Sequence, residues 1–387
     1  MKRFLVILVV LLLCRHAASP AEAEKRIRFD AKVNGQPVRF IFDTGASSPI
    51  TLLSPAAHRL GLKVVPANYR PDPGHVACGK TETCNLDLGT TNIRISLNVF
   101  ELPDYLYRAK EMDGVLGWPL LEEHIFAIDA ISDTLVFYDH VPPKTAGWIK
   151  FQVQTNSGIL ALELQGEKRA KAIVVVDTGH DGGIIVHPKK WQTWKQTHTN
   201  LPITLDASYM PGAGLVVKEE SFAHEIALGS LVITDVPVSE ANQAQIATDP
   251  NFEVSLGLAA LKRLEIIIDG EQKVAYLHPR STPASPYPHN RLGAVFVPRN
   301  LQEDDLVAEV IDGSPASTAG IRNGDNLLKI GNLDVTRWRT DPNVLPLSRF
   351  WDSPAGTKLE LTLKRGDNTF ITTATLRNIL APAAPKD

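Results

Sequence analysis

The chain has 387 residues, of which 44% are hydrophobic, and a formal net charge of −3. This length allows two or three domains with hydrophobic cores of their own, and the composition excludes a disordered or fibrous protein. Lys and Arg are scattered along the sequence and form no basic patch, so we expect no nucleic-acid partner.

Residues 1–23 have the pattern of a secretory signal peptide. Two basic residues precede an apolar run over 4–13, and small residues follow up to Ala23. The apolar run is too short to span a bilayer as a helix. We therefore expect a secreted or periplasmic protein with no integral membrane span. Lipoprotein anchoring through Cys14 is disfavoured, because the three leucines before it are not the small residues of a lipoprotein signal.

An internal repeat follows the signal peptide. "VRFIFDTGASSPITL" (38–52) and "AIVVVDTGHDGGIIV" (172–186) each place Asp-Thr-Gly between two apolar strands, and each precedes a short helix signal. Further along, each half carries a Leu-Gly pair and, twelve residues after that glycine, Asp129 or Asp269. Aspartate at the start of a tight turn bonds the turn's own backbone, so we expect both residues to be structural.

The repeat and the residues beyond it predict a mainly β chain in several parts. The two halves cover 24–143 and 144–279, a proline-rich linker covers 280–290, a small separate domain covers 291–378, and 379–387 form a flexible tail.

Two cysteines, Cys78 and Cys84, remain after the signal peptide. In an oxidising compartment they either form a short-loop disulfide or stay as free thiols, and the sequence leaves both alternatives open. A metal site would need more ligands than the neighbouring sequence offers.

The two Asp-Thr-Gly copies supply one carboxylate from each half, Asp43 and Asp177. If the halves meet at a pseudo-twofold axis, the two carboxyl groups lie close together and cannot both ionise cheaply, so one of them keeps a proton. Such a pair can activate a water for attack on a peptide carbonyl and protonate the leaving nitrogen. The glycine after each threonine allows the tight turn, and each threonine hydroxyl can bond the opposite loop.

Residues 27–278 resemble a pepsin-like or retropepsin-like aspartic peptidase. The motifs "FDTGASS" and "VDTGHDG", together with the downstream "VLG" and "SLG", carry the resemblance. The resemblance implies a bilobal β-fold with a cleft between the lobes, no cofactor, peptide or protein substrates, and a monomer, because one chain carries both motifs. It implies Asp43 and Asp177 as the catalytic pair, supported by Thr44, Gly45, Ala46, Thr178, Gly179 and His180. It also places β-hairpin flaps near 71–79 and, in the second lobe, 209–214.

His180 departs from this pattern, since the family usually has Ala, Ser or Thr there. Three hypotheses follow: the side chain points outward and the pair works, it shifts the pH optimum, or it marks a lost activity. A metal site built from His180, Asp181 and His187 has no matching ligands in the first half, so we expect no metal.

The C-terminal domain resembles a PDZ domain of the kind attached to bacterial envelope proteases. "RLGAVF" (291–296) and "GSPASTAGIRNGD" (313–325) carry the resemblance. It implies that a loop of backbone amides captures the terminal carboxylate of a C-terminal peptide, and that the following strand adds the peptide to the sheet edge. The implied binding residues are Leu292, Gly293, Ala294, Val295 and Phe296. The usual second helix of the groove is hard to see in "TDPNVLPLSRFW", and a structural or docking module is the alternative.

The sequence therefore predicts an exported aspartic endopeptidase with a PDZ domain that binds substrate or partner peptides. The rival hypothesis, from a different class, is a non-catalytic peptide-binding scaffold whose second motif is degenerate.

Overall fold

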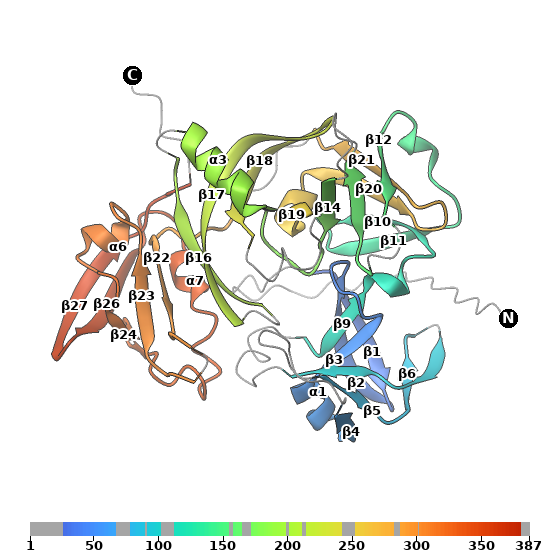
Figure 1. Cartoon of the computed structure of the whole chain (residues 1–387). Coiled ribbons are helices and arrows are strands. Elements are labelled where there is room, and N and C mark those ends of the chain that lie inside the picture. The colour runs from blue at the N-terminus through green and yellow to red at the C-terminus, as the bar shows by residue number, and fades with distance from the viewer. Residues whose placement is uncertain are drawn as a thin grey trace.

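The residues described by the structure, a computed structural model, form three β-sheets, which confirms the expected mainly β fold (Figure 1). It describes residues 26–66, 78–89, 91–101, 112–154, 158–164, 172–198, 201–210, 214–241, 252–281, 287–300 and 302–380. The predicted signal peptide lies outside the described residues. Within the described part of the chain, no helix is both long and apolar enough to cross a membrane.

The first sheet has nine strands in the order β4-β5-β8-β3-β9-β2-β1-β6-β7. Its strands are β1 (Arg28–Val33), β2 (Gln36–Asp43), β3 (Ile50–Leu53), β4 (Val64–Pro66), β5 (Cys78–Thr81), β6 (Cys84–Asp87), β7 (Asn92–Ile95), β8 (Asn98–Phe100) and β9 (Gly114–Gly117). Side chains of β1 alternate between exposed and buried, as in a strand with one face on a core. The strand before the first Asp-Thr-Gly, β2, becomes fully buried at Phe40, which carries its C-terminal end into the interior.

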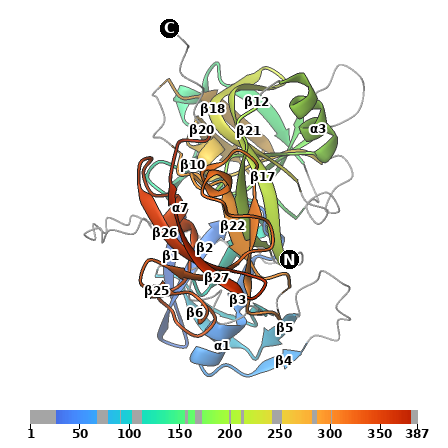
Figure 2. The ribbon, with the colours of Figure 1, turned by 90° about the vertical axis from the view of Figure 1, so that its left-hand side faces the viewer.

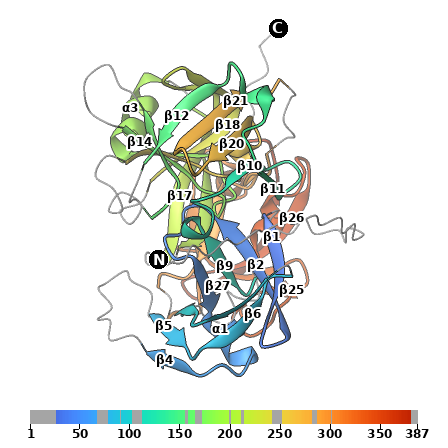
Figure 3. The same cartoon turned by 90° about the vertical axis from the view of Figure 1, so that its right-hand side faces the viewer.

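The second sheet has twelve strands in the order β11-β10-β20-β21-β12-β13-β14-β19-β15-β18-β17-β16. Its strands are β10 (Ile125–Asp129), β11 (Thr134–Tyr138), β12 (Ile149–Val153), β13 (Ala161–Leu164), β14 (Ala172–Val176), β15 (Ile184–Val186), β16 (Thr204–Met210), β17 (Gly214–Leu228), β18 (Leu231–Glu240), β19 (Phe252–Leu256), β20 (Leu264–Asp269) and β21 (Val274–Pro279). Figure 3 shows the first sheet below this one.

The sequence repeat reappears as a repeat of strand order. In the first sheet β2, β9, β3 and β8 are successive neighbours, and in the second sheet β14, β19, β15 and β18 are. In both sets the first pair is parallel, the second antiparallel and the third parallel. Each Asp-Thr-Gly loop therefore begins at the end of the first strand, β2 or β14, of an equivalent set of four strands.

The hairpin β10–β11 belongs to the second sheet, although its residues fall in the predicted first half. β10 pairs antiparallel with β20, with Phe126 opposite Ile268. The side chain of Phe126 is fully buried between the rings of Trp118 and Phe137. Strands from both sequence halves thus form one continuous sheet, and a boundary at residue 143 does not separate two sheets.

Short helices connect the strands. They are α1 (Ser54–Arg59), α3 (Pro188–Thr197), α5 (Leu258–Leu261) and the 3₁₀ turns η1 (Trp118–Leu120) and η2 (Pro143–Thr145). Pro55 lies in the first turn of α1, and the helix ends before Gly61, whose φ is +65°. The side chain of His187 caps α3 by accepting a hydrogen bond from the Lys189 amide.

The third sheet forms the C-terminal module, which we define as residues 291–380. Its strands run in the order β22-β23-β24-β26-β27, with β25 on β24. They are β22 (Ala294–Val297), β23 (Leu306–Val310), β24 (Asn326–Ile330), β25 (Leu333–Asp334), β26 (Lys358–Arg365) and β27 (Asn368–Thr375), with helices α6 (Pro315–Thr318) and α7 (Ser348–Trp351). Figure 1 and Figure 2 show this module beside β16 and β17.

Buried residues lie at two of the predicted boundaries. The end of the predicted linker, Asn290, is buried, because its side chain bonds both the module and β16. The start of the predicted tail is also packed, since Leu380 is buried. Residues 381–387 lie outside the described residues.

The disulfide between Cys78 and Cys84 is not formed, and Cys84 is a buried free thiol whose Sγ contacts the Ile95 carbonyl oxygen at 3.3 Å. The sheet order explains this, because β5 and β6 stand near opposite ends of the first sheet. Burial raises the pKa of the Cys84 thiol, so it stays protonated.

Candidate active site

The two aspartates of the repeat lie at the C-terminal ends of buried strands. Asp43 is the last residue of β2, and Asp177 follows the last residue of β14. Asp43 stands opposite Gly117 in the parallel ladder with β9, and the Asp177 amide donates to the Leu256 carbonyl of β19 at 2.9 Å. The apolar strands fix the two turns, and the turns direct both carboxylates to one point.

The two loops are tied together by their threonines, both fully buried. The Thr44 amide donates to Thr178 Oγ1 at 3.1 Å, and the Thr178 amide donates to Thr44 Oγ1 at 3.1 Å. Each hydroxyl then donates across the interface, Thr44 to the Val176 carbonyl at 2.6 Å and Thr178 to the Phe42 carbonyl at 2.8 Å. This symmetric set of bonds places the predicted support residues Thr44 and Thr178 in reciprocal roles.

The glycines of the two motifs leave room for the opposite carboxylate. A Cβ on Gly45 would lie 2.9 Å from the Asp177 carboxyl carbon, and one on Gly179 would lie 2.3 Å from that of Asp43. Any residue other than glycine would place its Cβ in this space and displace the opposite carboxylate. Close approach of the opposite carboxylate, rather than a positive φ, is why each motif has glycine here.

The carboxyl groups bond each other, and each also accepts a backbone hydrogen bond from its own loop. Gly45 N donates to Asp43 Oδ1 at 2.8 Å, and Gly179 N donates to Asp177 Oδ1 at 3.0 Å. Burial raises the pKa of Asp43. Burial and then the adjacent Asp43 charge raise the pKa of Asp177 well above its ordinary value. The pair therefore shares one proton over a broad pH range.

Arg26 is a further residue of the site that the sequence reasoning did not identify. Its guanidinium donates from Nη1 to the Gly179 carbonyl oxygen, and Nη2 lies 3.9 Å from Asp181 Oδ2. The side chain is only 9% exposed, and its charge lowers the pKa of both Asp43 and Asp177. No local pattern marks this arginine, because its partners come from the other half of the repeat.

His180 takes the place in the second loop that Ala46 takes in the first. The Ala46 amide donates to the Asp43 carbonyl and the His180 amide to the Asp177 carbonyl, at 3.0 and 3.4 Å. The ring packs over Gly257, where a Cβ would lie 2.3 Å from Nδ1. Its Nε2 lies 3.4 Å from Nζ of Lys218 on β17. An ammonium only donates, so Nε2 is the acceptor in this contact.

The flap predictions fall partly outside the described residues. Residues 71–77 of the first flap and 211–213 of the second are not described. The strands on either side of the second segment form a hairpin, in which Met210 of β16 stands opposite Gly214 of β17. Lys218 extends from this hairpin to the active-site loop, which places the hairpin next to the site.

Asp129 and Asp269 have the structural roles expected from the sequence. Asp129 Oδ1 accepts from the Ile131 amide at 3.1 Å, and Asp269 Oδ1 accepts from the Gln272 amide at 2.9 Å. Both carboxylates are therefore engaged in turns between strands.

The residues predicted to bind a C-terminal peptide are buried: Leu292, Gly293, Ala294, Val295 and Phe296. Asn290 Oδ1 accepts hydrogen bonds from the amides of Leu292 and Gly293, at 2.9 and 3.0 Å. The carboxamide thus occupies the two donors that a terminal carboxylate would need. On the outer side of β22, the strand β16 lies alongside.

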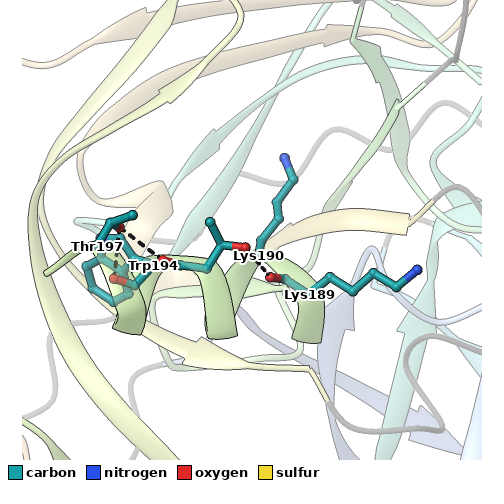
Figure 4. A pocket seen from close by; sticks show the side chains of 5 residues that line it. Lys189, Lys190, Trp194 and Thr197 are labelled. Carbon is teal, nitrogen blue, oxygen red and sulfur yellow. Dashed lines mark hydrogen bonds between the residues drawn. The ribbon is translucent and has the colours of Figure 1, made fainter.

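Neither a metal site nor the hollow on α3 adds a second candidate site in the described residues. The described residues include no group of three or more His, Cys, Asp or Glu side chains arranged to hold a metal ion. A shallow hollow runs along the outer face of α3 (Figure 4), lined by Lys189, Lys190, Thr193, Trp194 and Thr197. Its threonine hydroxyls donate to carbonyls of the helix itself, at Lys189 and Thr193, so both hydroxyls are already engaged.

Residues 29–120 match the family model described as aspartyl protease. The match covers the first Asp-Thr-Gly and its downstream Leu-Gly, and it stops before the second half of the repeat. No curated protein matches the chain. The second loop lies outside the matched segment, and its Thr178 makes the same hydrogen bonds to the first loop as Thr44 makes to the second.

Proposed function

We propose that this chain is an aspartic endopeptidase whose catalytic groups are Asp43 and Asp177. The observation that carries the proposal is the pair of hydrogen-bonded carboxyl groups held by reciprocal Thr44–Thr178 bonds. The aspartyl protease match of residues 29–120 supports the same reaction class.

The reaction follows from the uneven protonation of the pair. Asp43 is ionised and accepts a proton from a water molecule, whose oxygen attacks the peptide carbonyl carbon. Asp177 gives its proton to the carbonyl oxygen, so a neutral tetrahedral diol forms. When the C–N bond breaks, the nitrogen takes the proton from Asp43, and one diol proton returns to Asp177. The products are a carboxylic acid and an amine, and the pair is restored.

The test is hydrolysis of a denatured protein between pH 3 and 7, with and without a statine-containing peptide that mimics the tetrahedral intermediate. Asp43→Asn and Asp177→Asn should each lower kcat by about 10²–10⁴-fold, the usual effect of losing a general acid or base. Asp30→Asn, at an exposed residue of β1, is the matched control. If the unaltered chain hydrolyses nothing in this range, the non-catalytic scaffold replaces the peptidase.

We also propose that the protein is exported and that a single chain forms the complete active site. The pattern of residues 1–23 supports export, and the presence of both Asp-Thr-Gly motifs in one chain supports a working monomer. N-terminal sequencing of the protein purified from medium or periplasm tests cleavage near Ala23, and a concentration-independent specific activity tests the monomer.

For the C-terminal module we propose a PDZ-like fold, with a glycine loop at Gly293 followed by the edge strand β22. The helix α7 lies next to this strand, with the Phe296 and Trp351 rings 6.1 Å apart. A peptide carboxylate could reach the loop amides only after Asn290 has left them.

A further inference from the structure

The junction between the C-terminal module and the β16–β17 hairpin is unusually polar for a buried contact. Thr204 Oγ1 of β16 donates to the Asn290 carbonyl at 2.7 Å, and Asn290 Nδ2 donates to the Leu205 carbonyl at 2.9 Å. Thr204, Asn290 and Val295 of β22 are all 5% exposed or less. These bonds fix β16 against the module and remove the edge of β22 from solvent.

Acidic residues from both sides meet at the same junction. Glu220 of β17 is 5% exposed, and the Tyr287 hydroxyl lies 3.2 Å from its Oε2. Asp352, at the end of α7, lies close enough to Asp206 of β16 for each charge to disfavour the other. Other groups that act on Glu220 or Asp352 are Lys218 of β17, Arg291 of the module and Asp181 of the active-site loop.

We propose that this junction is a proton-dependent latch: the C-terminal module holds the β16–β17 hairpin while Glu220 and Asp352 are protonated and releases it as they ionise. The latch would regulate the site described above, and that consequence rests on the proposed peptidase function. The docking itself is a property of the fold and can be measured in an inactive chain.

The charge balance gives the direction of the effect. Burial, then the charge of Asp206, raises the pKa of Glu220 to about 8 and that of Asp352 to about 7. An acid whose pKa is higher in the docked state than in the released state stabilises docking at low pH. This stabilisation of the docked state is lost as the pH rises through the pKa values of Asp352, about 7, and Glu220, about 8. When both are ionised, they and Asp206 place three negative charges at the junction, against the cations Lys218 and Arg291.

Release would affect the active site through Lys218. Its Nζ lies 3.3 Å from Asp206 Oδ2 and 3.4 Å from His180 Nε2, so it joins the hairpin to the loop of Asp177. The side chain is only 12% exposed. Movement of the hairpin therefore removes a contact of the catalytic loop, in addition to uncovering β22.

The experiment measures the radius of gyration of the full chain by small-angle X-ray scattering from pH 5 to pH 9. Asp43→Asn is present in every sample, so self-cleavage does not interfere and the result does not depend on peptidase activity. We expect the radius to rise with pH as the module separates, while circular dichroism shows unchanged strand content. The double variant Glu220→Gln, Asp352→Asn should keep the pH 5 radius up to pH 9.

The matched control is Glu219→Gln, the neighbour on β17 that bonds Lys195 of α3 instead of the junction. This variant should keep the full transition. The latch is overturned if the radius of the parent chain stays constant to pH 9, or if the double variant shows the same transition as the parent. If the double variant does not fold, each single substitution must shift the transition to higher pH, and an unshifted transition in both overturns the latch.

Discussion

At the scale of single residues, Arg26 acts on the charge of the proposed catalytic pair, Asp43 and Asp177, from outside both motifs. Its charge lowers the pKa of Asp43 and of Asp177. In the proposed mechanism, activity appears when the pair loses its first proton and disappears when it loses the second. Arg26→Met should therefore move both limbs of the pH profile of kcat/KM to higher pH. Arg28→Met, at an exposed residue of β1, should leave both limbs in place. Unmoved limbs in the Arg26 variant would contradict this role.

The reciprocal threonine bonds should dominate the stability of the site. Thr178→Val leaves the Thr44 amide and the Phe42 carbonyl buried without these partners, at a cost of about 3 kcal/mol. Thr178→Ser keeps the hydroxyl and loses one methyl group, so about 1 kcal/mol is expected. Urea denaturation of both variants compares these values. Equal losses in the two variants would show that the hydroxyl contributes little.

The three hypotheses for His180 can be separated by one substitution. The His180 amide makes the same backbone hydrogen bond as the Ala46 amide, and its ring contacts Lys218. His180→Ala should therefore retain kcat/KM within about tenfold, or 1.4 kcal/mol. The matched Ala46→Gly measures how sensitive the other loop is. A loss of a hundredfold or more with His180→Ala would assign the ring a role in catalysis.

Sequence reasoning identified the residues that repeat and missed those that cross between parts of the chain. Asp43, Asp177 and the two threonines stand in the same pattern twice, so their position beside one another could be predicted. Arg26 and Asn290 have no such pattern, because their partners are distant in sequence: Gly179 for one and Leu205 for the other. Only the folded chain brings those partners together.

At the scale of elements, the pairing of β10 with β20 is the seam between the two sequence halves. The side chain of Phe126 on β10 is fully buried in this seam. Phe126→Ala should lower the free energy of unfolding by about 3–5 kcal/mol, the usual cost of truncating a buried aromatic side chain. Ile131→Ala, at a side chain that is 57% exposed, should cost much less. Guanidinium denaturation provides the measurement, and similar costs for the two variants would show a loosely packed seam.

The strands and helices were easier to predict from the sequence than the pairing of the strands within the sheets. The apolar runs before each Asp-Thr-Gly and the helices after Ser54 and His187 follow from local patterns. The assignment of β10–β11 to the second sheet does not, because a hairpin's sequence shows which residues are buried and not which strand lies beside it. The separation of β5 from β6, which leaves Cys84 free, is another long-range property of this kind.

At the scale of the whole molecule, the C-terminal module is part of the same packed body as the hairpin next to the active site. Asn290 connects the two, since its side chain bonds Leu205 on one side and Leu292, Gly293 and Ala294 on the other. The prolines of 280–288 predicted an extended linker that ends at this residue. The buried carboxamide instead bonds the module to β16.

Asn290→Ala should uncouple the module from the hairpin even at pH 5. The substitution leaves two amides and two carbonyls without their partner, and each buried polar group left unpaired costs about 1–3 kcal/mol unless water reaches it. Water reaches these groups only if β16 and β22 separate, so undocking is the lower-cost outcome. Calorimetry should then show the module unfolding apart from the rest, whereas Asn300→Ala, in an exposed turn of the same module, should unfold like the parent. A single unshifted transition for Asn290→Ala would mean that apolar contacts alone hold the module, and the amides freed by the substitution would then be open to a peptide carboxylate without any movement of the hairpin.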